Sequence, residues 1–282
     1  MLIVVPLFFI VVLIMKRPSI SAGESHLLEL SLVIVAGFLG GMLNAVAGGG
    51  SFLTLPALIF VGVPPVMANA TGTAALLPGY IASAWRFRKD IEFPANLSFK
   101  TLSLISILGG SLGATILLFT SEQVFSSLIP WLILIATILF IIGPRLLPNK
   151  ESSKEVVDAD KSDLTKTRVT AFLVMLSVCA YGGYFNGGLG IILLAALSLL
   201  GQTNLLGMNG VKNYVSALLT AIAVLVYVVG GVIEYKYLII MGVAAIVGGY
   251  AGAALAYRIP QNLMRGFIIV IGLIMATVFF LR

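Results

Sequence analysis

The chain has 282 residues, of which 60% are hydrophobic and only 10% are charged, and its mean hydropathy is +1.11. Soluble domains carry about a quarter of their residues as charged side chains, so this composition excludes that class and indicates an integral membrane protein. The net charge of +6 is explained by basic cytoplasmic loops and predicts no binding of nucleic acid. A single cysteine, Cys179, and a single histidine, His26, predict neither a disulfide framework nor a His/Cys metal site.

Nine apolar segments are candidates for membrane-spanning helices, each of which needs about 20 residues to cross the hydrocarbon. In chain order they are residues 1–15, 27–47, 67–85, 98–119, 125–146, 169–185, 208–231, 236–257 and 262–281. Their apolar runs are continuous, which predicts helices, because strands of a membrane barrel alternate polar and apolar side chains. Two shorter stretches, 52–63 and 189–200, are predicted to be half-helices that enter the membrane and turn back. The expected fold is an all-α multi-pass bundle in the inner or plasma membrane.

Residues 148–168, with the sequence "PNKESSKEVVDADKSDLTKTR", are polar and have no apolar period, so they are interpreted as a solvated cytoplasmic linker. The linker separates residues 27–147, a first transmembrane repeat, from residues 169–282, a second one. Residues 1–26 form an N-terminal helix and loop. The start of that helix has no basic region before its apolar run, so it is predicted to be an extra helix and not a cleaved signal.

An internal repeat underlies this division. The stretch "GGMLNAVAGGG" from Gly40 has a counterpart in "GGYFNGGLG" from Gly182, and "GGSLGA" from Gly109 has one in "GGYAGA" from Gly248. Matching positions lie about 140 residues apart throughout, which indicates two copies of one unit. The pairs that carry the match are Asn44 with Asn186, Gly50 with Gly190, and Asn69 with Asn209.

The distribution of basic residues predicts that the second copy is inverted in the membrane. Each copy, as a re-entrant hairpin followed by three spans, crosses an odd number of times. The loops with Arg86, Lys100 and Arg265, and the linker, then share one side, as the positive-inside rule requires. Lys16 and Arg17 do not fit this arrangement. Glycines 109, 110, 113, 248, 249 and 252 are expected to allow close helix packing.

Three adjacent glycines, Gly48, Gly49 and Gly50, interrupt the first repeat where a membrane helix would otherwise continue. Backbone that is not helical persists at membrane depth only inside protein or beside a polar cavity. The half-helix that begins near Ser51 directs its positive N-terminal end at this turn, where an anion is favoured. We therefore predict a substrate-binding site formed here by Asn44, Gly48, Gly49, Gly50, Ser51, Asn69 and Thr71, although Ser51 and Thr71 could equally be helix caps.

The second repeat contributes the equivalent set, namely Asn186, Gly190, Asn209 and Lys212. Its glycine run is shorter and lacks a match to Pro56, so we expect a less sharp break in this half. Lys212 is the one basic residue placed well inside the hydrocarbon zone, and no acid is near it in sequence. The sequence leaves two alternatives open: Lys212 snorkels to the interface, or it faces the cavity with the substrate as its counter-ion.

The positions of the acidic residues limit which transport mechanisms the sequence predicts. All eleven map to loops, the linker or helix ends, so a proton relay through a membrane carboxylate is not predicted. The membrane region also offers no paired carboxylates, Ser/His pair or metal cluster, which argues against an enzyme and against a cofactor. Broken helices in inverted repeats favour a secondary transporter that alternately exposes a central site, with a channel of paired half-helices as the alternative.

The stretch "NAVAGGGSFLTLPALIFVGVPPVMANATGT" closely resembles the first-repeat signature of the TauE/SafE sulfite exporter (TSUP) family, and "GGYFNGGLG" resembles its second. The resemblance covers about residues 30–281. It implies an inner-membrane exporter or permease of small anionic sulfur compounds, such as sulfite or sulfonated organic acids. It also implies a substrate cavity between the two glycine-rich breaks. The partners expected are therefore the anion and the lipid bilayer, and the sequence leaves the existence of a homo-oligomer open.

Overall fold

The structure is a computed structural model that describes residues 22–89, 91–94, 97–142, 161–202, 204–256 and 261–281. The predicted span at residues 1–15 and the first part of the linker lie outside these ranges. The described residues form ten helices and no strands, as expected. In chain order the helices are α2 (Ala22–Ala47), α3 (Ser51–Phe60), α4 (Pro65–Phe87), α5 (Phe99–Leu118), α6 (Glu122–Ile142), α7 (Lys161–Tyr184), α8 (Leu189–Leu199), α9 (Leu205–Val229), α10 (Tyr235–Ala256) and α11 (Gln261–Phe280).

The predicted spans that fall on described residues are confirmed as helices, with ends that differ by a few residues. By length and hydropathy, four stretches of the described chain qualify as full spans: His26–Ala45, Phe99–Leu118, Glu122–Leu139 and Gly207–Val229. The largest difference is at α7, which begins at Lys161, inside the segment assigned to the linker. Helix formation there needs no apolar period, because it continues a helix that the membrane segment already nucleates.

The outward faces of the helices are apolar. On α5, for example, Leu104, Leu108 and Leu112 are about half exposed, and Ile239, Val243 and Val247 are similarly exposed on α10. In water such stripes would be an aggregation hazard, but in a bilayer they face lipid. The inward faces instead carry small residues and the buried core.

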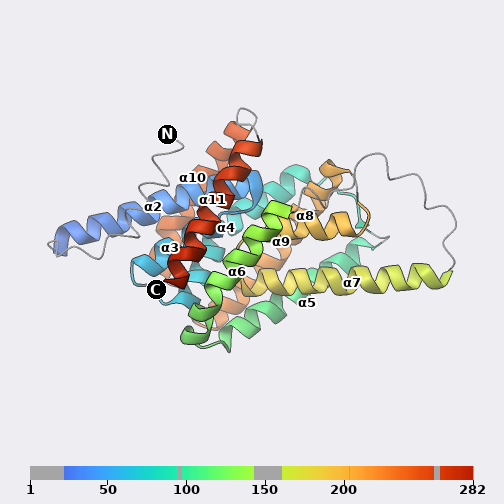
Figure 1. Ribbon diagram of the computed structural model, residues 1–282, viewed down its shortest axis with the longest axis horizontal. Helices are drawn as coiled ribbons and strands as arrows, with labels where there is room; N and C mark the ends of the chain where they lie inside the picture. Colours follow the sequence, from blue (N-terminus) through green and yellow to red (C-terminus); the bar gives the residue numbers. More distant parts are fainter. Residues whose placement is uncertain are drawn as a thin grey trace.

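The helices of the two halves pack in matching pairs. The first helix of each half lies along the fourth helix of the other: α2 packs on α10, and α7 packs on α5. The central pair α4 and α9 also contact each other, as do α6 and α11. In Figure 1, α2 extends to one end of the molecule and α7 to the opposite end, although they are at equivalent places in the two halves.

Glycines allow these pairs to approach closely, as predicted. A Cβ placed on Gly113 would lie 1.9 Å from the Ala180 carbonyl oxygen, and one on Gly248 would lie 1.8 Å from that of Phe38. Gly109 and Gly110 are equally crowded, by Cys179 and Leu219. Small residues at helix interfaces replace the hydrophobic driving force that lipid removes, because they increase van der Waals contact.

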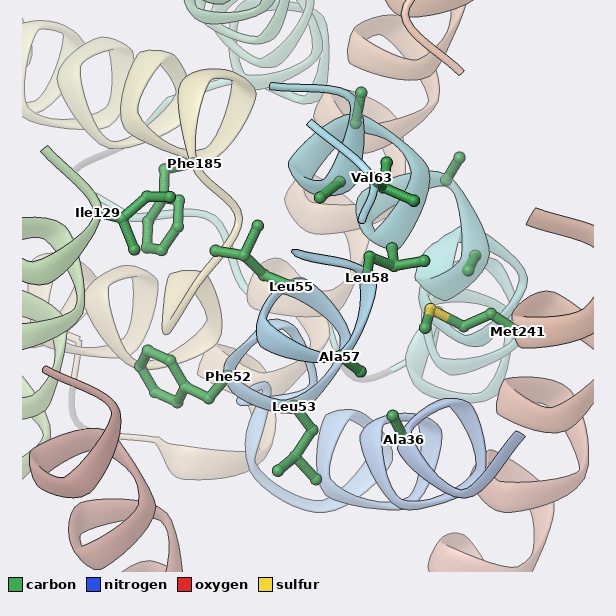
Figure 2. Close-up of a cluster of buried hydrophobic side chains, with 14 of the residues drawn as sticks. Ala36, Phe52, Leu53, Leu55, Ala57, Leu58, Val63, Ile129, Phe185 and Met241 are labelled. Carbon is green, nitrogen blue, oxygen red and sulfur yellow. The ribbon is translucent and has the colours of Figure 1, made fainter. Parts of the chain in front are cut away.

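The half-helix α3 lies in the middle of the bundle and is apolar on all sides, as a buried helix should be. Its side chains pack in several directions: Figure 2 shows Leu55 beside Ile129 of α6 and Phe185, and Leu58 on the side facing Met241 of α10. Residues 51–58 are all buried. Protein therefore surrounds the short helix, so its ends do not meet lipid.

Substitution of Gly248 tests this packing. We expect Gly248→Ala to destabilise the folded protein by about 1–3 kcal/mol, because the added methyl group overlaps the backbone of α2. Thermal unfolding in detergent measures the effect. The matched control is Gly242→Ala on the same helix, where the nearest atom to a new Cβ is 4.0 Å away. Equal melting temperatures for the two variants would contradict the packing assigned to α2 and α10.

Candidate functional site at the two helix breaks

The first break separates α2 from α3 at residues 48–50. Gly48 has φ of +77°, a left-handed conformation that glycine adopts without steric cost. Its backbone N–H donates to the carbonyls of Leu43 and Asn44, at 3.2 and 3.1 Å, which closes the end of α2. The three glycines and Ser51 are buried, so the predicted interruption is real and lies inside the protein.

The second break separates α7 from α8 at residues 185–188, and it is as sharp as the first. Gly188, the counterpart of Gly48 in the repeat, has φ of +73°. The expectation of a less sharp break in this half is therefore wrong. One left-handed glycine suffices to reverse the chain, so neither a longer glycine run nor a match to Pro56 is required.

The two breaks contact each other directly. A Cβ on Gly48 would lie 3.0 Å from the Cα of Gly190, so backbone from one half touches backbone from the other. Any side chain at Gly48 would separate them. This contact places Gly48 of the first half against Gly190 of the second.

Side chains from elsewhere satisfy the carbonyls at the end of α7. The Asn69 amide nitrogen donates to the Tyr184 carbonyl at 3.0 Å, and the Tyr227 hydroxyl donates to the carbonyl of Gly183. In the break itself, the Tyr181 hydroxyl donates to the Gly187 carbonyl at 2.8 Å. Asn69 therefore lies at the second break and not at the first, the half to which it belongs in sequence.

A buried hydrogen-bonded network joins the two predicted asparagines. The Tyr80 hydroxyl of α4 donates to Oδ1 of Asn186 at 2.6 Å, and Nδ2 of Asn186 donates to the Thr220 hydroxyl at 3.2 Å. The Asn44 side chain lies beside Tyr80. Its Nδ2 atom lies 3.9 Å from a Cβ placed on Gly79, next to Tyr80. Asn44 and Asn186 are thus two ends of one network.

Tyr80 and Thr220 were not predicted from the sequence. They occupy equivalent positions, about 140 residues apart, on α4 and α9. A polar residue that recurs at the repeat offset in the apolar second part of both helices was the signal that could have identified them.

Several buried polar atoms near the first break have no hydrogen-bond partner. They include Oδ1 of Asn44, which is only 8% exposed, and the hydroxyl oxygens of Ser51 and Thr54. A Cβ on Gly50 would lie 3.0 Å from Asn44 Cβ, and one on Gly40 would lie 2.8 Å from Cγ2 of Thr54. Asn44 therefore lies beside the start of α3, and the Thr54 hydroxyl lies on the side of α3 that faces Gly72 of α4. Unsatisfied buried groups are rare in native proteins, and a bound ligand is one reason for them.

Two predicted residues have other partners. Thr71 accepts a hydrogen bond from the backbone N–H of Glu234 at 2.9 Å, so it ties α4 to the start of α10. Lys212 is 6% exposed, and its Nζ donates to Oδ1 of Asn209, one turn away, at 3.0 Å. Asn209 and Lys212 thus form a pair on α9, and no described contact joins the pair to Asn44 or Asn186.

A cavity of about 460 Å³ lies away from the breaks, between the start of α5 and α7. It is lined by Leu97, Ser98, Thr101, Arg168, Val169 and Phe172. None of the predicted site residues lines it. Among the described residues, no three His, Cys, Asp or Glu side chains are grouped so as to hold a metal ion.

Comparison with known proteins shows which family the chain matches. The family described as sulfite exporter TauE/SafE matches residues 33–279. A probable membrane transporter protein of Haemophilus influenzae is 27% identical, covering 87% of this chain and 92% of its own length. The probable membrane transporter proteins ORF9 of Sinorhizobium sp and YfcA of Escherichia coli are 22% and 23% identical, each over 88% of this chain.

Removal of the Tyr80 hydroxyl tests the network. Tyr80→Phe leaves Oδ1 of Asn186 without its donor, so we expect a loss of about 1–3 kcal/mol in the free energy of unfolding. Thermal unfolding in detergent is the measurement. Tyr250→Phe serves as the control, since Tyr250 is 83% exposed on α10. A Tyr80 variant as stable as the control would mean that the network contributes nothing to stability.

Proposed function

This chain belongs to the sulfite exporter TauE/SafE family, and from this premise we propose that it moves small anionic sulfur compounds across the membrane by alternately exposing a central site. Its membership makes it a membrane transporter and a multi-pass protein of the plasma membrane. The proposal adds the charge of the substrate, the location of its site and the mechanism. Sulfite is the principal substrate proposed, and sulfonated organic acids are the weaker alternatives.

The start of α3 is the observation that carries the proposal. Neither α3 nor α8 has a side-chain cap at its N-terminus. At α3 the N–H groups of residues 52–54 donate to the carbonyls of Gly49 and Gly50, so the donors proposed for the anion are the backbone N–H groups of Gly50 and Ser51. At α3, the hydroxyl of Ser51 is buried without a partner in the first turn, and that of Thr54 is buried without a partner on the side facing Gly72 of α4. Hydroxyl donors and a helix N-terminus together favour a bound anion.

The buried ammonium group of Lys212 also supports an anionic substrate. Lys212 has a neutral partner in Asn209, and no described carboxylate lies within ion-pair distance of it. Taking an ammonium group out of water is costly unless a counter-charge or a polar cavity compensates. We propose that the transported anion supplies that charge during the transport cycle.

The directions of the helices support inverted repeats. Gly37 and Gly41 lie against Met241 and Ala245 in order, so α2 and α10 run in the same direction. The contacts of Gly109 and Gly113 with α7 likewise make α5 and α7 parallel. Because α2 and α7 extend to opposite ends in Figure 1, equivalent helices of the two halves run in opposite directions. Inverted repeats with breaks at mid-membrane are typical of secondary transporters.

The contact between Gly48 and Gly190 favours a transporter over a channel. A channel needs a continuous polar path, but here backbone from the two halves meets at the proposed site. A closed centre is one state of an alternating-access cycle. Single-channel currents carried by the purified protein in planar bilayers would instead support the channel.

Counterflow in proteoliposomes tests the proposed function. Vesicles loaded with unlabelled sulfite should accumulate labelled sulfite, with sulfate and sulfoacetate as comparison substrates. We expect Asn44→Ala and Lys212→Ala to reduce the initial rate at least about tenfold, because each removes a buried polar group proposed to face the anion. Lys100→Ala, an exposed lysine at the start of α5, is the control. Undiminished flux in both test variants would remove the site assignment.

A further inference from the structure

Donors and acceptors can be assigned along the network that joins the two breaks, because each hydrogen bond in it needs one donor and one acceptor. Tyr80 has a single hydroxyl proton, and the bond of 2.6 Å commits it to Oδ1 of Asn186. The Tyr80 oxygen can then only accept from other groups. We infer that Asn44 directs its amide nitrogen toward Tyr80, since Nδ2 lies beside Gly79, the neighbour of Tyr80 in the chain.

The orientation of the Asn44 amide determines which atom of that side chain is left to contact a ligand. With Nδ2 directed at Tyr80, Oδ1 is directed elsewhere, and it is buried without a partner. A carbonyl oxygen of an amide can only accept hydrogen bonds. The start of α3 therefore combines a group that can donate, the hydroxyl of Ser51, with one group that can only accept, Oδ1 of Asn44.

A fully deprotonated oxyanion does not match these two groups. Every surface oxygen of sulfite or sulfate in the dianionic form is an acceptor, so one of them would face the Asn44 oxygen with no proton between them. Such a contact is repulsive in a buried site, and it leaves Oδ1 unsatisfied. An anion with one acidic O–H satisfies both kinds of group.

We propose that the site at the first break binds its oxyanion in the singly charged, protonated form, with the O–H of the anion donating to Oδ1 of Asn44. This inference rests on the proposed function. The bound proton crosses the membrane as part of the anion, as hydrogen sulfite and not as sulfite. Net flux is then coupled to the proton gradient without any carboxylate in the membrane.

The proton that Oδ1 of Asn44 accepts is assigned to the anion, because the titratable side chains around Asn44 do not supply it. Helix α2 packs against α3, α4, α10 and α11. Of the described titratable side chains on these helices, Tyr80 is the one that contacts Asn44, and its proton is committed to Asn186. Lys236 and Tyr237 lie in the first turn of α10, near His26 at the other end of α2.

The pH dependence of transport is the first test. Initial rates of labelled sulfite uptake are measured in proteoliposomes at several pH values across the second ionisation of sulfurous acid. Above that ionisation, we expect KM for total sulfite to rise about tenfold per pH unit, and KM calculated for hydrogen sulfite to stay constant. A KM that is constant for the dianion would overturn the inference, because Asn44 would then present its nitrogen to the site.

A matched pair of competitors gives the second test. Methanesulfinate carries the same single charge as hydrogen sulfite but has a methyl group where the acid has its hydroxyl. We expect it to inhibit wild-type uptake at least about tenfold more weakly. In Asn44→Leu, which keeps the size of the side chain but removes the acceptor, the two inhibition constants should become nearly equal. Equal inhibition in the wild type would overturn the inference.

Two controls make the outcomes distinguishable. Ser51→Ala keeps the acceptor and removes a donor, so it should weaken both competitors equally and preserve their ratio. Ligand-induced shifts in melting temperature report binding by any variant that is folded but inactive. Failure of wild-type protein to bind or move any sulfur oxyanion would overturn the proposed function and this inference together. Sulfite flux with the wrong pH dependence overturns the inference alone.

Discussion

Backbone carbonyls that are not paired within a helix are the constraint on which this structure depends. In hydrocarbon no water can satisfy them, so a broken helix survives only if protein donors reach its ends. The end of α7 shows how this is achieved: Asn69 and Tyr227 donate to the carbonyls of Tyr184 and Gly183. Asn69 belongs to the first half of the chain and α7 to the second. The break in one half is therefore completed by the other half.

This dependence determines the packing around the centre. The donors can reach the breaks only if the helices lie very close, and glycines permit that approach at the contacts of α2 with α10 and α5 with α7. Residues 51–58 of the half-helix α3 are then buried, and Figure 2 shows their side chains directed at several neighbouring helices. Close packing also brings Tyr80 between Asn44 and Asn186, so the two breaks share one network. A proposed site that spans both halves would sense any movement of one half against the other.

Much of the fold was predictable because the membrane imposes a strong rule on sequence. Spans follow from apolar length, and their described ends agree within a few residues except at α7, where the helix extends into polar sequence. The breaks followed from glycine and from the recurrence of Asn44 as Asn186. Tyr80 and Thr220 were missed because one polar residue in an apolar helix has no local signature. The second break was judged less sharp because the length of a glycine run was counted, although one left-handed glycine, Gly188, is sufficient.

The sequence by itself determined that this chain is a helical membrane protein with two related halves, where each half is interrupted, and which family it resembles. These properties depend on composition, segment length and the recurrence of short motifs, all of which are local in the chain. Only the tertiary structure decided that Gly48 meets Gly190, that Asn69 serves the opposite half, and that Thr71 binds the loop before α10. It also decided the direction in which Asn44 presents its amide. Such choices depend on which donors and acceptors come within about 3 Å of one another, and hydrogen-bond geometry between distant segments exists only after the chain has folded.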